Sequence, residues 1–127
     1  MKKNNIIIGI VTLNSLHLVK NLLVKTQIDI NIFDIIITRD DASATKPSLD
    51  LYLAALKKLN VDKEQVIAIE DSNVGIISAV TTGIRVINVS DIDNVTNENK
   101  KKCYVTVKSL DNIINIFKEK RILNEYY

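Results

Sequence analysis

The sequence predicts an α/β protein built on a parallel sheet that has helices on both faces. Short β-branched runs recur along the chain, and the first four are apolar on both faces, as is typical of strands buried on both sides. Between the runs, apolar residues stand three to four positions apart, which is the spacing of a helix face. We therefore expect strands beginning at Ile6, Asp34, Val66 and Arg85 with helices between them, followed by a small strand and a last helix.

Length and composition are those of one cytoplasmic domain. A chain of 127 residues is long enough to bury a single core. Lys and Arg number 17 against 15 Asp and Glu, and this balance leaves no basic stripe for a nucleic-acid partner. No run reaches the ~20 apolar residues of a membrane span, and the single Cys103 excludes an internal disulfide. We expect a single domain over residues 1–127 that binds neither nucleic acid nor membranes.

A few residues mark where helices should begin and end. Ser15 is placed to cap a helix, and Pro47 suits the first turn of the next one. Gly83 stands where a left-handed residue would end a third helix. The polar stretch of residues 91–102 shows no such pattern, and we expect a surface loop there.

Polar residues gather where the strands should end, which is the edge at which open parallel sheets bind ligands. The first strand is followed by Thr12 and the third ends in Glu70 and Asp71, while Lys46 directly precedes a helix. Adjacent carboxylates at a buried strand end repel each other unless a cation lies beside them. Oxygen ligands suit Mg²⁺ completed by a phosphate, and a hydroxyl and an ammonium group suit the phosphate. The plainer alternative is that Asp71 or Ser72 only caps the next helix and that the other charges are solvated.

Two motifs resemble a known family. The segments KPSLDLY and EDSNVG are similar to the haloacid dehalogenase superfamily, in particular to its β-phosphoglucomutase and phosphoglycolate-phosphatase-like branch. In that branch a Lys-Pro pair opens a helix that carries Asp-x-Tyr, here Asp50 and Tyr52. A strand ends in Glu-Asp-Ser with a glycine three residues later, here Gly75. The resemblance covers residues 6–118 and implies a Rossmann-like three-layer α/β/α core.

The resemblance also implies roles for particular residues. Thr12 and Asn14 take phosphate-binding positions, and Lys46 is the cation that steadies both the phosphate and the catalytic nucleophile. Asp71, with Glu70 beside it, is expected to bind Mg²⁺. The implied cofactor is therefore Mg²⁺, and the implied partner is a small phosphorylated metabolite.

One part of the family pattern is missing. The family's reaction begins with a nucleophilic Asp in a D-x-D-G motif after the first strand, and the second Asp is the general acid and base. Here only MKKNN precedes Ile6. Residues 91–95 imitate the motif, but they follow the last main strand and have Asn94 in place of the glycine. The family's substrate-selecting cap is also absent, so we expect the C-terminal core of such an enzyme, from a truncated gene or a shortened chain, inactive alone.

The sequence leaves other functions open. Besides the core of a Mg²⁺-dependent phosphatase or phosphomutase, it allows a non-catalytic phosphate- or metal-binding protein, a protein completed by a partner, or a degraded remnant. If the resemblance holds, the strands lie in the order second, first, gap, third, fourth. The edges at the gap are then expected to pair with each other, to form a dimer, or to bind a partner segment that supplies the missing strand.

Overall fold

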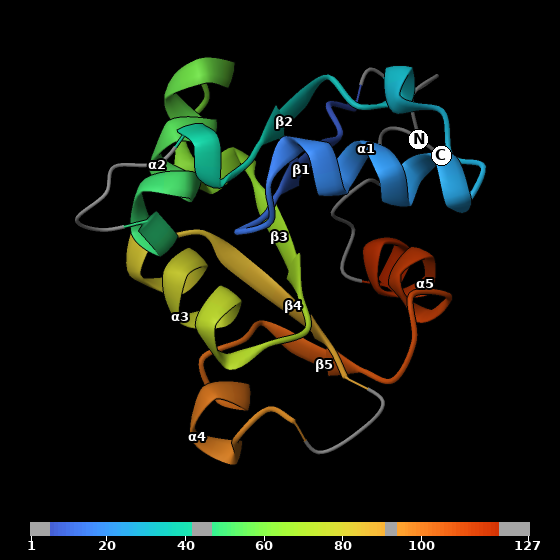
Figure 1. The fold of residues 1–127 in the computed structure, drawn as a ribbon. Coiled ribbons are helices and arrows are strands. Elements are labelled where there is room, and N and C mark those ends of the chain that lie inside the picture. The colour runs from blue at the N-terminus through green and yellow to red at the C-terminus, as the bar shows by residue number, and fades with distance from the viewer. Residues whose placement is uncertain (1–5, 42–46, 91–93, 120–127) are drawn as a thin grey trace. The chain divides into compact units, whose positions relative to one another are not determined.

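The computed structural model describes residues 6–41, 47–90 and 94–119 (Figure 1). These residues group into two compact units, Met1–Val61 and Asp62–Tyr127. That the two units form a single domain stays a prediction. In chain order the helices and strands are β1 (Gly9–Val11), α1 (Leu16–Lys25), β2 (Ile35–Ile37), α2 (Pro47–Leu59), β3 (Ile67–Glu70), α3 (Asn73–Thr82), β4 (Arg85–Val89), α4 (Asn97–Lys100), β5 (Val105–Val107) and α5 (Asn112–Glu119). No helix among the described residues is long and apolar enough to cross a membrane.

The first unit is built on a two-stranded parallel sheet. Strands β1 and β2 pair so that Gly9 lies opposite Ile35. Helix α2 packs against both strands (Figure 1). Its apolar side buries Leu51 and Ala55 against Ile35 and Ile37, which form the core of this unit. The apolar spacing after Pro47 therefore predicted this helix correctly.

The second unit contains a three-stranded parallel sheet in the order β3-β4-β5. The pairing places Glu70 opposite Asn88 at the carboxyl end of the first two strands. Helix α3 packs against β3 and β4 and buries Ile76 completely. The β-branched run at 104–107 thus forms a strand, as expected, although a short one.

The expected helix ends are confirmed where they are described. The hydroxyl of Ser15 accepts the N–H of Leu18 at 3.2 Å and caps α1. Gly83 has a φ of 91° and ends α3 in the left-handed conformation. Both signals are local, because cap and helix are neighbours in the sequence.

The first strand starts later than expected, at Gly9 rather than Ile6. The N–H of Asp34 donates to the carbonyl of Ile8 at 2.7 Å, but the N–H of Ile8 donates to the carboxylate of Asp34 at 2.9 Å. A side chain therefore takes the place of the partner's backbone at this point. The regular strand pairing begins one residue later for that reason.

The α/β class with parallel strands is confirmed, but one continuous sheet is not formed. The expected neighbours, second with first and third with fourth, pair as predicted. They belong to two separate sheets, β1-β2 and β3-β4-β5. Among the described strands, none is paired with members of both sheets. That the two edges pair with each other, form a dimer or bind a partner segment stays a prediction.

The expectation of a loop over residues 91–102 is also partly wrong. Residues 91–93 lie outside the described residues, but the next segment forms the short helix α4. Thr96 caps this helix by accepting the N–H of Asn99 at 3.2 Å. Asn99 is buried although the surrounding sequence is polar. Its side-chain amide is satisfied by Asn73 of α3, at 2.8 Å, which is a contact that sequence periodicity does not reveal.

Candidate functional site

The predicted site residues are divided between the two units. Thr12 and Asn14 lie in the first unit, where they contact each other, and Glu70 and Asp71 are neighbours in the second. Lys46 lies outside the described residues, so its predicted role is carried forward as a proposal. The two described pairs offer different chemistry.

Thr12 is half-buried directly after β1. Its N–H donates to the carbonyl of Ile37 at 3.0 Å, which continues the pairing of β1 with β2. Its hydroxyl oxygen accepts the N–H of Asn14 at 3.1 Å. A threonine hydroxyl has one proton to donate in addition to the lone pairs it uses as acceptor. This geometry therefore fixes the oxygen of Thr12 while leaving its proton for donation to an anion.

The start of α1 is closed by a carboxylate. The carboxylate of Asp40 accepts the N–H of Leu16, the first residue of the helix, at 3.2 Å. A negative charge here is favourable because the helix N-terminus carries a partial positive charge. A phosphate would be attracted to the same position, but the N–H of Leu16 already donates to Asp40. The two residues are 24 positions apart, and nothing in the sequence pattern indicates this bond.

Asp71 is exposed immediately after β3. The residue that caps α3 is Ser72, whose hydroxyl accepts the N–H of Gly75 at 3.1 Å. The capping alternative raised by the sequence is therefore confirmed for Ser72. Capping does not explain the carboxylate of Asp71, because Ser72 already caps α3.

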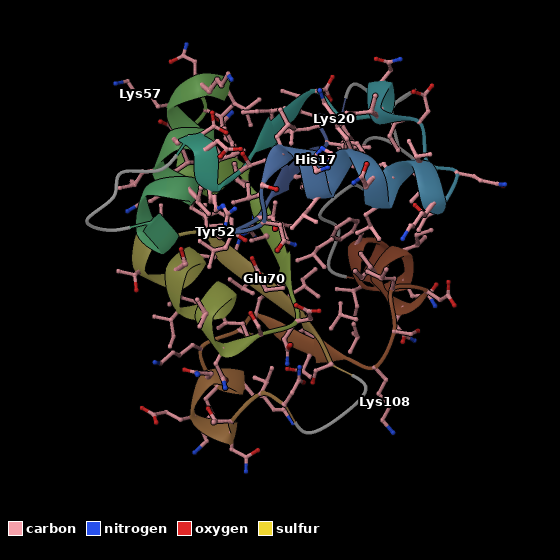
Figure 2. The ribbon with its side chains drawn as sticks, in the orientation of Figure 1. His17, Lys20, Tyr52, Lys57, Glu70 and Lys108 are labelled. Carbon is pink, nitrogen blue, oxygen red and sulfur yellow. The ribbon has the colours of Figure 1, made fainter. Side chains whose placement is uncertain are left out.

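Glu70 is half-buried, and its carboxylate lies beside the first turn of α3 (Figure 2). A β-carbon added at Gly75 would come within 2.9 Å of Oε1 of Glu70. Such close approach is open only to glycine, because every other residue places a β-carbon there. The glycine of the motif thus makes room for the glutamate five residues earlier.

The donors at the end of β3 fit Mg²⁺. Asp71 and Glu70 supply carboxylate oxygens from adjacent positions. Among the described residues no three His, Cys, Asp or Glu side chains gather into a group that could hold a metal ion alone. Mg²⁺ commonly uses one or two carboxylates and completes its shell with water and substrate phosphate, whereas a structural Zn²⁺ requires four protein ligands. Binding of a partly hydrated Mg²⁺ by this pair is therefore carried forward as a proposal.

Sequence reasoning missed the residues that hold the backbone at Asp71. The side-chain amide of Asn94 donates to the carbonyl of Asp71 at 3.0 Å. In return, the side-chain amide of Asn73 donates to the carbonyl of Asn94 at 3.3 Å. The two asparagines thus join the segment before α4 to the turn between β3 and α3. They are 21 positions apart in the sequence.

Comparison with known proteins identifies a family pattern over most of the chain. The family model described as haloacid dehalogenase-like hydrolase matches residues 1–89. That range contains Thr12, Lys46 and the Glu70-Asp71 pair.

Two curated proteins illustrate the similarity. A phosphorylated carbohydrates phosphatase of Thermotoga maritima is 32% identical over 90 residues, which are 68% of this chain and 41% of that protein. The protein CbbY of Cereibacter sphaeroides is 43% identical over 56 residues, which are 44% of this chain and 24% of that protein. The matched segments thus span less than half the length of these relatives.

Solved structures agree with the fold. CbbY from Rhodobacter sphaeroides, crystallised with phosphate, superposes with a TM-score of 0.73 at 30% identity over 85% of this chain and 48% of that one. A β-phosphoglucomutase from Clostridium difficile gives a TM-score of 0.70 at 26% identity, over 95% of this chain and 53% of that one. The chain therefore spans about half of each structure.

Proposed function

This chain belongs to the haloacid dehalogenase-like hydrolases, and on that premise we propose that it supplies the phosphate- and metal-binding part of a Mg²⁺-dependent phosphatase or phosphomutase. The proposed substrate is a small phosphate ester. CbbY has been crystallised with phosphate and with xylulose-1,5-bisphosphate, and the relative in Thermotoga maritima is named for phosphorylated carbohydrates. These neighbours support a sugar phosphate as the substrate class.

The observation that carries the proposal is the position of Asp71. Asp71 is exposed directly after β3, and the residue before it, Glu70, has its carboxylate in the space beside Gly75. Asp71 and Glu70 would hold Mg²⁺, Asp71 as a ligand and Glu70 beside it. When bound, this ion supplies positive charge that neutralises the phosphoryl oxygens during transfer.

The phosphate would be bound by the other predicted residues. Thr12 donates its hydroxyl proton to a phosphate oxygen, since its own oxygen already accepts the backbone N–H of Asn14. Asn14, which is exposed, adds its side-chain amide as a further donor. Lys46 contributes a point charge that steadies the phosphate and the attacking carboxylate.

Turnover needs a nucleophile that we propose comes from another segment. Attack on phosphorus requires a carboxylate that forms an aspartyl-phosphate, and a second group that protonates the leaving oxygen and then activates water. In the 127 residues no Asp precedes Ile6, where the family's D-x-D-G motif would stand. We propose that this motif lies in a longer form of the same protein or in a separate chain.

A second candidate function is supported by the strand edges. Among the described strands, β1 pairs only with β2, and β3 pairs only with β4. A strand at the edge of a sheet can pair with another chain. A protein that binds phosphate without turnover, as a dimer or with a partner segment, would use these edges.

Phosphate-ester hydrolysis and phosphate binding, measured side by side, test the proposal. The purified 127-residue chain should not hydrolyse sugar phosphates with Mg²⁺ above background, because binding groups alone leave only residual catalysis. It should still bind inorganic phosphate in calorimetry when Mg²⁺ is present, and Asp71→Asn should abolish this binding. Asp111→Asn, a change at an exposed aspartate of the same unit, should leave it intact.

Two results would contradict the proposal. Phosphate binding that ignores both Mg²⁺ and Asp71→Asn would refute the metal site. Hydrolysis that Asp71→Asn abolishes would mean that the nucleophile lies within these 127 residues, and the Asp91–Val95 segment would then have to be reconsidered.

A further inference from the structure

Four polar residues form a chain of hydrogen bonds that ends at the backbone of Asp71. The oxygen of the Asn73 side chain accepts the amide of Asn99 at 2.8 Å and the N–H of Thr96 at 3.0 Å. The nitrogen of the Asn73 side chain donates to the carbonyl of Asn94, and the side chain of Asn94 donates to the carbonyl of Asp71. Helix α4 and the segment before it are thereby fastened to the start of α3 (Figure 1).

We propose that Asn94 is a positioning residue for Asp71. It orients the peptide that follows Asp71, and the direction of the Asp71 carboxylate is set by that peptide. The inference rests on the proposed metal-binding role of Asp71 and deepens it.

The position of Asp71 explains why such a contact is needed. Regular pairing of β3 ends at Glu70, and the first helical carbonyl is that of Ser72, which accepts the N–H of Ile76 at 3.0 Å. The Asp71 carbonyl falls between the two regular elements. Its hydrogen bond comes from Asn94, 23 residues later in the sequence. Without this bond the peptide after Asp71 would be held only by its two neighbours.

The network supports Asn94 from its buried end. Asn99 is only 7% exposed, so its bond to Asn73 is shielded from water, whereas Asn94 and Asp71 are exposed. Buried polar contacts of this kind hold their partners in one arrangement. The side chain of Asn73, held by α4, therefore restrains Asn94, and the side chain of Asn94 restrains the carbonyl of Asp71. In metal sites, groups that orient a ligand affect metal affinity although they do not touch the ion.

The test uses the full 127-residue chain, labelled with ¹⁵N, and Mn²⁺ as a paramagnetic probe for the Mg²⁺ site. Mn²⁺ broadens the amide signals nearest to it, so the concentration that broadens Ser72 by half reports the affinity of the site. Asn94→Ala should raise that concentration about threefold to tenfold, in the lower range seen for residues that orient metal ligands. Asn94→Gln keeps the amide donor and should recover part of the loss. Asn97→Ala, an exposed asparagine of α4, is the matched control and should change nothing.

The outcomes separate this inference from the proposed function. If Asp71→Asn does not alter the broadening, the metal site itself is refuted, and the role of Asn94 with it. If Asp71→Asn weakens the broadening and Asn94→Ala does not, only the present inference is overturned. A thermal melt of each variant shows whether it is still folded. If Asn94 had only a structural role, Asn99→Ala, which removes the buried contact, should reduce Mn²⁺ affinity more than Asn94→Ala does.

Discussion

The carboxylate of Glu70 occupies the place beside Gly75 that a β-carbon would fill. This relationship links the strand end to the first turn of the helix that follows it. The N-terminus of a helix carries a partial positive charge and favours a negative charge nearby. Glycine at this position is thus explained by the side chain it accommodates rather than by its own backbone conformation.

Replacing Gly75 with alanine should separate stability from metal binding. The new methyl group would displace the end of the Glu70 side chain, which can rotate away, while alanine is favoured over glycine in a helix by about 1 kcal/mol. We expect the free energy of unfolding to change by less than about 1 kcal/mol. The affinity for Mn²⁺ or Mg²⁺, measured by titration, should fall about threefold to tenfold because Glu70 has moved.

Gly83→Ala is the matched control for that experiment. Gly83 has a φ of 91°, a conformation that is costly for alanine, so its replacement should lower the free energy of unfolding by about 1–2 kcal/mol. Metal affinity should not change. A Gly75→Ala variant that loses stability as Gly83→Ala does, and retains its metal affinity, would contradict the role given to Glu70.

Asn88 should be dispensable for stability although it is completely buried. Its side-chain oxygen has no hydrogen-bond partner in the described structure, and its nitrogen is 3.4 Å from the hydroxyl of exposed Thr106. A buried polar atom without a partner costs about 1–3 kcal/mol. Asn88→Val, which keeps the volume and favours a strand, should therefore raise the denaturant midpoint.

The matched comparison is Asn99→Val, because Asn99 is also buried but its amide is bonded to Asn73 at 2.8 Å. We expect this change to cost about 1–3 kcal/mol, since it leaves the oxygen of Asn73 with one partner fewer. If Asn88→Val instead proves as destabilising as Asn99→Val, the oxygen of Asn88 must bind a buried water or a ligand.

The thiol of Cys103 should make stability fall at high pH. Partial burial raises the pKa of Cys103 above its ordinary value of 9.0. Below that value the thiol is protonated in both the folded and the unfolded chain, and its contribution is fully present. As the pH rises further, the unfolded chain loses the proton first, so stability is lost until the folded pKa is passed. Urea unfolding from pH 8 to pH 11 should show this decline relative to Cys103→Ser. Equal slopes for the two proteins would contradict it.

The parts of the fold that were predictable depend on residues close together in the sequence. Ser15 caps the helix that starts one residue later, and Gly83 ends the helix directly before it. The contact of Asn94 with Asp71 depends instead on how α4 packs on α3, and no periodic pattern records that packing. The division between the β1-β2 and β3-β4-β5 sheets was expected only from the family resemblance, which places a gap between the first and third strands. Apolar runs predict strands, but they do not state which strand must be present to join them.

The family resemblance implies site roles for Asp71 and Thr12 without revealing how each is held. Asp71 is oriented by a residue 23 positions later, and the helix after Thr12 is closed by Asp40. These partners are an amide and a carboxylate in polar segments, where such residues are usually solvated. Their roles are visible only once the chain is folded.

The last prediction concerns the unpaired edge of β3. Ile69, on this strand, is 45% exposed although it is a large apolar residue. A peptide with an apolar strand that ends in D-x-D-G should pair with this edge and cover Ile69. At a concentration 100-fold above its dissociation constant it would stabilise the chain by about 2.7 kcal/mol, which raises the melting temperature by several degrees. A peptide of scrambled sequence should have no effect.

Ile69→Glu should leave the melting temperature of the chain alone nearly unchanged and remove the response, because the charge would be buried under the added strand. Size-exclusion chromatography should show a dimer without the peptide and a monomer with it if two copies otherwise share this edge. A monomer whose melting temperature ignores the peptide would mean that the edge of β3 needs no partner, and that the nucleophile, if there is one, does not arrive by this route.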